Sequence, residues 1–257
     1  MKILCLRISV LCLLFLRLAP CSWSAQAVLE QILDNGPREN RINLVFLSEG
    51  FMEEELDAFV YHARNYLGGL LATPPFDDYM SYLNAFVVRV ASAESGSDHP
   101  SAMLKRDTYF NSSYGNLGQD RLIEIPPNSY ESDFQSGHGK VQALLKTFSF
   151  EHAIPILIVN DPEYGGSGDG SGRALTIVSL NNSGVRLMLH EFGHTLASLG
   201  DEYVYESLAY LAQESPNTTR EYRRDFIPWH DWIDHSTPIP TPTSGRHADE
   251  EIGRAHV

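Results

Sequence analysis

The stretch H-E-F-G-H-T-L-A-S-L-G-D-E-Y, residues 190–203, decides the fold that we expect for this chain. It overlaps residues 185–199, where apolar side chains recur at helical spacing, and the preceding N-S-G at 182–184 can cap a helix. Residues four apart on a helix are turned by only about 40° from each other. His190 and His194 therefore project from one face of the helix and can share one metal ion.

The same stretch supplies a candidate base and a candidate third ligand. Glu191 points about 100° away from His190, so its carboxylate lies beside the metal and could take a proton from an activated water. Catalytic zinc usually has three protein ligands and a water. We expect the helix to break at Gly200 and to bring Asp201 back to the metal, with Glu202 as the alternative ligand.

Other readings use the same residues. The two histidines could be buried core residues that donate to backbone carbonyls, and Tyr203 could be an oxyanion-stabilising group or an ordinary half-buried tyrosine. A closed structural zinc site needs a fourth protein ligand, for which His230 and His235 are candidates. The chain would then be an exported metal-binding module or pseudo-peptidase without catalysis. A zinc amidase would keep the same site with a different pocket.

The N-terminus predicts export. Lys2 is followed by an apolar run to residue 18 and then by small residues up to Ala27, which is typical of a secretory signal peptide over residues 1–27. A membrane anchor and a lipoprotein anchor at Cys21 are the alternatives. All three cysteines lie in this leader, so the mature chain carries no disulfide. We expect a secreted, periplasmic or cell-surface protein.

Net charge limits the partners. The chain carries a formal charge of −14, and removal of the three basic residues Lys2, Arg7 and Arg17 with the leader changes it to −17. This charge argues against nucleic acid or an anionic membrane as a partner. We expect a protein or peptide substrate and no stable membrane partner after cleavage, and the sequence does not specify the oligomeric state.

The last seven residues of the chain resemble an artificial sequence. Residues 251–257, E-I-G-R-A-H-V, can be encoded by a sequence that matches the start of a common short-read sequencing adapter. We therefore expect a non-native tail at 251–257 and a peptidase domain at 28–250 that is incomplete at its C-terminus.

Alternating strand and helix patterns predict an α/β fold with helices packed on a mixed, twisted sheet. The Gly-rich segment 161–172 contains neither G-x-G-x-x-G nor a Walker lysine, so we expect a mobile loop bordering the cleft rather than a nucleotide site. The strand before the motif helix could hold an extended substrate by edge pairing. The expected strands are 41–47, 82–91, 120–125, 154–160 and 174–180, and the expected helices are 51–71, 139–150 and 185–199.

Four segments resemble the immunoglobulin A peptidase family of zinc metallopeptidases. They are residues 190–203, D-N-G-P-R-E-N-R-I-N-L-V-F-L-S-E-G at 34–50, S-A-E-S-G-S-D-H-P at 92–100 and V-N-D-P-E-Y-G-G at 159–166. The likeness covers most of residues 33–243. It implies a zincin-like fold in exported bacterial proteins that hydrolyse peptide bonds with one catalytic Zn²⁺.

The resemblance also assigns roles, with His190, His194 and Asp201 as ligands and Glu191 as base. The chain departs from the metzincin pattern H-E-x-x-H-x-x-G-x-x-H, because Ala197 replaces its glycine and a glycine replaces its last histidine. Related peptidases place a methionine turn under the metal, and here no methionine follows position 188. That departure agrees with a missing C-terminal part.

Overall fold

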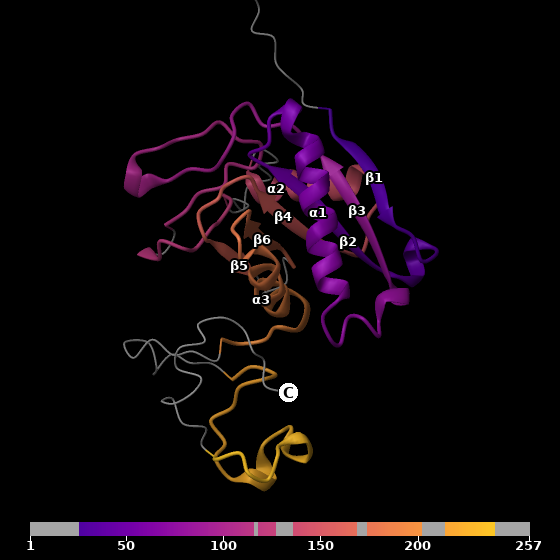
Figure 1. The fold of residues 1–257 in the computed structure, drawn as a ribbon, viewed down its shortest axis with the longest axis vertical. Helices are drawn as coiled ribbons and strands as arrows, with labels where there is room; N and C mark the ends of the chain where they lie inside the picture. The colour runs from indigo at the N-terminus through magenta and orange to yellow at the C-terminus, as the bar shows by residue number, and fades with distance from the viewer. Residues whose placement is uncertain (1–25, 116–117, 127–135, 169–173, 202–213, 240–257) are drawn as a thin grey trace, which may run out of the picture.

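A computed structural model describes residues 26–115, 118–126, 136–168, 174–201 and 214–239 (Figure 1). Nearly all of the predicted signal peptide, residues 1–27, lies outside the described residues, as do Glu202, Tyr203 and the expected tail at 251–257. Within the described part of the chain, no helix has the length and apolar character needed to cross a membrane.

The fold is built on a mixed sheet of six strands in the described residues, in the order β1-β3-β2-β4-β6-β5. The four central strands run parallel, and the two edge strands β1 and β5 run antiparallel to their neighbours. The predicted mixed α/β sheet is confirmed. The strands are β1 (Val28–Leu33), β2 (Ile42–Glu49), β3 (Leu83–Arg89), β4 (Ala153–Val159), β5 (Gly166–Gly168) and β6 (Thr176–Ser179).

Helices cover both faces of this sheet (Figure 1). Helices α1 (Leu56–Leu71) and α3 (Gly184–Ala197) pack on one face, and α2 (Gly137–Thr147) packs on the other. Strand β4 contributes to both cores, with Ile156 and Ile158 facing α1 and α3 and Leu157 facing α2. Burial on two sides explains why its sequence is almost continuously apolar.

Short 3₁₀ turns connect these elements. Four of them precede α2 and two follow the motif helix: Arg38–Asn40, Glu53–Glu55, Met80–Tyr82, Pro100–Ala102, Arg224–Phe226 and His230–Trp232. The helix expected from residue 51 therefore begins as a 3₁₀ turn and becomes α-helical at Leu56.

The structure differs from the expected strands in several places. Residues 166–168 form the edge strand β5 rather than a loop, and β1 was not expected at all. The segment 120–125 makes only isolated bridges, Leu122 to Gly166 and Glu124 to Ser113. Strand β6 is flanked by β4 and β5, so it has no free edge with which to pair a substrate. Glycine has low strand propensity, which hides β5 in the sequence.

Candidate active site

Helix α3 is fixed against α1 and the sheet by close packing. The Tyr66 hydroxyl in α1 donates to the Ser179 carbonyl at the end of β6, at 2.8 Å. Gly184, at the start of α3, lies so close to the Tyr66 ring that a β-carbon there would clash with it. Met188 and Phe192 are fully buried on the core side of α3. This contact turns the other side of the helix, with the motif histidines, away from α1.

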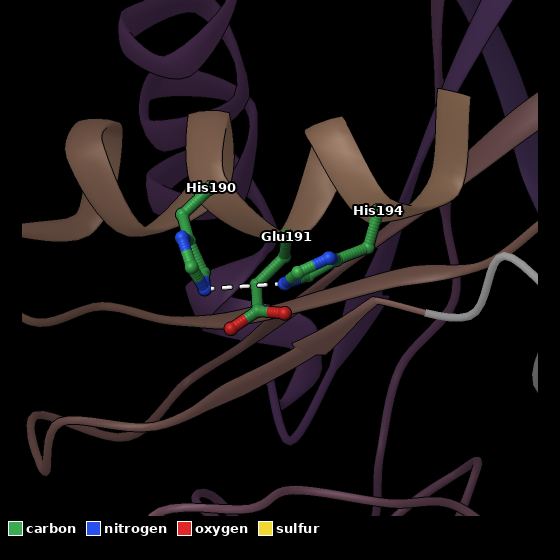
Figure 2. Close-up of side chains that lie close together, drawn as sticks. All are labelled: His190, Glu191 and His194. Carbon is green, nitrogen blue, oxygen red and sulfur yellow. Dashed lines mark hydrogen bonds between the residues drawn. The ribbon is translucent and has the colours of Figure 1, made fainter. Parts of the chain in front are cut away.

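His190 and His194 come together on that side, as their spacing predicts (Figure 2). Their Nε2 atoms are 3.2 Å apart. The Asp201 carboxylate joins them, since its Oδ1 lies 3.1 Å from Nε2 of His190 and 3.3 Å from Nε2 of His194. These three atoms form a nearly equilateral triangle.

The triangle fits a tetrahedral zinc ion. Zinc binds imidazole nitrogen and carboxylate oxygen at about 2.0–2.2 Å, and tetrahedral angles then place neighbouring ligand atoms about 3.3–3.6 Å apart. The three observed separations lie within about 0.5 Å of that range. The residues present therefore suit zinc by donor type and by spacing, and a small outward movement accommodates the ion.

The end of α3 brings Asp201 into place by a route that differs from our expectation. The helix ends at Ala197, and Ser198 adopts the left-handed conformation at φ 52°, so the chain reverses there and not at Gly200. The Ser198 and Leu199 amides donate to the carbonyls of His194 and Gly193 in the last turn, at 3.0 and 3.3 Å. The break comes early because this turn satisfies the last helical carbonyls.

The same turn orients His194. Its Nδ1 hydrogen-bonds to the Leu199 carbonyl, which can only accept, so Nδ1 carries the proton. In the neutral ring, Nε2 then presents its lone pair to the site. Partners of this kind fix the tautomer and the ring plane of a metal ligand.

Figure 2 shows the Glu191 side chain beside the two imidazoles. Glu191 is only 8% exposed. Its carboxylate lies within 4.8 Å of both imidazoles, but the Asp201 oxygen is the third vertex. Gly166 of β5 makes room for it, because a β-carbon there would lie 3.1 Å from Oε1. Burial raises the pKa of Glu191 to about 7, even though both histidines lower it. A carboxyl group that titrates near neutral pH suits proton transfer.

His194 and Asp201 shift each other's pKa. The hydrogen bond that His194 donates to the Asp201 carboxylate raises the pKa of His194 to about 9. Burial alone would raise the pKa of Asp201, but hydrogen bonds from His190 and His194 hold it well below its usual range. Imidazole nitrogens therefore lie against a carboxylate oxygen, and both are ligand types that a divalent cation binds in place of protons.

The candidates for a fourth ligand are not part of this group. The His230 ring contacts the Ile227 carbonyl at 3.0 Å and Asp231 at 3.2 Å, both close to it in sequence. Neither His230 nor His235 belongs to the cluster of possible metal ligands in the described residues. The alternative reading, in which one of them closes a structural zinc site, therefore finds no support in the described residues.

The profile of the IgA peptidase M64 family matches residues 30–254. The chain belongs to the IgA peptidase M64 family. The match confirms the family resemblance and makes the chain a peptidase, hence a hydrolase that acts on protein or peptide substrates. No match was found among curated proteins.

A peptidase needs a cleft beside its reactive groups, and the structure has one. A hollow of about 320 Å³ is bordered by Gly168 of β5, by His194 and by residues 198–201. A larger apolar cavity of about 640 Å³ lies between α3 and the start of β2, around Phe76 and Phe192. It contains none of the metal-site residues, so we assign the chemistry to the smaller hollow.

The sequence predicts that the Gly-rich segment borders the cleft, but not that part of it is the strand β5 or that its glycines contact α3. Gly166 and Gly168 are positioned where a side chain would meet Glu191 or His194. The only signal in the sequence is the glycine spacing in G-G-S-G at 165–168 ahead of the motif helix. That signal is too general to predict a helix–strand contact without the structure.

Proposed function

We propose that this chain is an exported zinc-dependent endopeptidase in which His190, His194 and Asp201 hold the metal and Glu191 is the general base. The observation that supports it most strongly is the triangle of two imidazole nitrogens and one carboxylate oxygen, each 3.1–3.3 Å from the others. A buried carboxyl group adjoins that triangle.

Zinc, when bound there, supplies Lewis-acid chemistry by polarising the peptide carbonyl and lowering the pKa of water. The chain supplies the proton transfer. Glu191 accepts a proton from the attacking water as the new C–O bond forms, and it gives this proton to the leaving nitrogen as the C–N bond breaks. Asp201 and the Leu199 carbonyl keep His194 oriented throughout.

Strand β5 is the edge on which an extended peptide would lie. The Gly166 amide donates to the Arg121 carbonyl at 3.1 Å and its carbonyl accepts from Ile123 at 3.4 Å, so its outward groups are occupied. Strand alternation directs the amide and carbonyl of Gly168 to the same outer edge. We infer that substrate pairing starts at Gly168, directly beside His194.

The variant Glu191→Gln tests the base assignment, because it keeps the shape and removes the proton acceptor. We expect kcat on casein or a quenched peptide to fall by about 10²- to 10⁴-fold while bound zinc is unchanged. The exposed Glu151→Gln is the matched control and retains full activity. Undiminished hydrolysis by a folded, zinc-loaded Glu191→Gln protein would refute the assignment, and hydrolysis of small amides alone would favour an amidase.

Export is proposed from the leader pattern at 1–27. Removal of the leader at Ala25-Gln26-Ala27 predicts that the mature protein begins at Val28. N-terminal sequencing of the protein from the producing cell checks this. A retained Met1, with the protein inside the cell, would contradict it.

A further inference from the structure

Gly200, the residue before the proposed third ligand, is held by the side chain of Asn217, which lies 17 positions later in the sequence. The Gly200 amide donates to Oδ1 of Asn217 at 2.7 Å, and Nδ2 of Asn217 donates to the Gly200 carbonyl at 2.9 Å. A single carboxamide therefore satisfies both backbone polar groups of the residue adjacent to Asp201. The pairing resembles one rung of a β-ladder.

A tight turn presents Asn217 for this contact. Ser215 and Thr218 exchange two backbone hydrogen bonds at 3.1 Å, and the Thr218 hydroxyl accepts a further bond from the Ser215 amide at 3.2 Å. The turn fits against Gly200 so closely that a β-carbon there would lie 2.5 Å from the Ser215 Oγ. Position 200 must therefore be glycine for the two segments to meet.

From this geometry we infer that Asn217 is a positioning residue for the metal site, acting through Gly200 to place the Asp201 carboxylate. The inference rests on the proposed function, in which Asp201 is a metal ligand. Asp201 lies beyond the end of α3, and its side chain is 39% exposed, so the helix itself does not fix it. The Asn217 contact supplies that constraint and reduces the conformational freedom that Asp201 loses on binding.

Asn217 also begins the sequence N-T-T at 217–219, which matches an N-glycosylation sequon. Nδ2 of Asn217 is the atom to which a glycan would be attached, and here it donates to the Gly200 carbonyl. In a eukaryotic expression host, where such a sequon can be glycosylated, the glycan would place a bulky group at the contact with Gly200. Protein for metal studies is therefore best made with this site unglycosylated.

The direct test is the affinity of the purified chain for Zn²⁺, measured by competition with a chromophoric chelator. We expect Asn217→Ala to bind Zn²⁺ about 10- to 100-fold more weakly, the usual loss when a group that orients a ligand is removed. The visible spectrum of bound Co²⁺ should change as well, because the carboxylate is no longer held in place. Thr219→Ala, in the same loop and with its hydroxyl near Glu214, is the matched control.

A compensating pair separates positioning from folding. Gly200→Ala should weaken Zn²⁺ binding as Asn217→Ala does, and adding Ser215→Gly should restore part of the affinity by removing the atoms that clash. The inference is overturned if Asn217→Ala binds Zn²⁺ as tightly as the wild type, or if Ser215→Gly gives no recovery. Failure of the wild-type chain itself to bind Zn²⁺ would instead reject the proposed metal site.

Discussion

Gly168 should be one of the positions in the active site that is least able to accept a side chain. A β-carbon there would overlap the carbonyl oxygen of Glu191 and lie 2.9 Å from the β-carbon of His194. Both separations are shorter than the 3.4 Å at which ordinary contact begins, so β5 and α3 must move apart in Gly168→Ala. Both neighbours belong to the helix framework, and neither can swing aside as a flexible side chain does.

The size of the effect follows from this shift. Overpacking of this kind costs about 1–3 kcal/mol, and each kcal/mol lowers Tm by about 2–4 °C in a domain of this size. A misplacement of about 1 Å in an active site can cost 100-fold in rate, so we expect kcat/KM to fall by about 10- to 100-fold.

The matched control is Gly68→Ala. Gly68 is exposed in α1, and nothing lies within 4 Å of the position that a β-carbon would take. Alanine is the better helix former, so this variant should gain about 0.5–1 kcal/mol and keep full activity. Thermal unfolding and peptide hydrolysis measure both variants. A Gly168→Ala protein as stable and as active as Gly68→Ala would refute the reasoning.

Three further predictions concern stability. Burial raises the pKa of Glu49 above its ordinary value of 4.5, so the folded state binds the proton more tightly and stability declines as pH rises through the raised pKa. Urea midpoints at a series of pH values should fall more steeply with rising pH in the wild type than in Glu49→Gln, where the other groups with a raised pKa, such as Glu191, still titrate. Tyr66→Phe leaves the Ser179 carbonyl without its donor and should cost about 1 kcal/mol in the free energy of unfolding. Phe192→Ala empties a fully buried position in the motif and should cost about 3–5 kcal/mol, measured in the same way.

Each of these has its own contrary result. An equal pH dependence in the wild type and Glu49→Gln would show that Glu49 does not contribute to the decline. An unchanged unfolding energy in Tyr66→Phe would mean that water replaces the hydroxyl. A loss below 1 kcal/mol in Phe192→Ala would mean that the core collapses around it.

The residues that sequence reasoning placed correctly are those joined by local chemistry. The spacing of His190 and His194 on an amphipathic helix needs no distant contact to bring the two rings together. The parallel strands were also visible, because apolar runs such as residues 154–160 signal burial on both faces of a sheet.

The residues that were missed depend on contacts between distant segments. Gly166 and Gly168 belong to a strand that pairs with β6 and packs closely against α3, and no propensity reveals these contacts. The helix ends at Ala197 because Ser198 adopts the left-handed conformation. Glycine adopts that conformation more readily, so the sequence predicts the break at Gly200 instead. Asn217 acts on Gly200 across a gap of 17 residues, and its sequence context indicated only a sequon.

The central claim is that a zinc ion held at His190, His194 and Asp201 is required for peptide-bond hydrolysis. The most direct measurement is the rate of cleavage of a quenched peptide before zinc is removed by a chelator, after its removal, and after its return. The account predicts that activity disappears with the metal and returns with about one equivalent of Zn²⁺ per chain. Undiminished cleavage by protein shown by elemental analysis to be free of metal would contradict it.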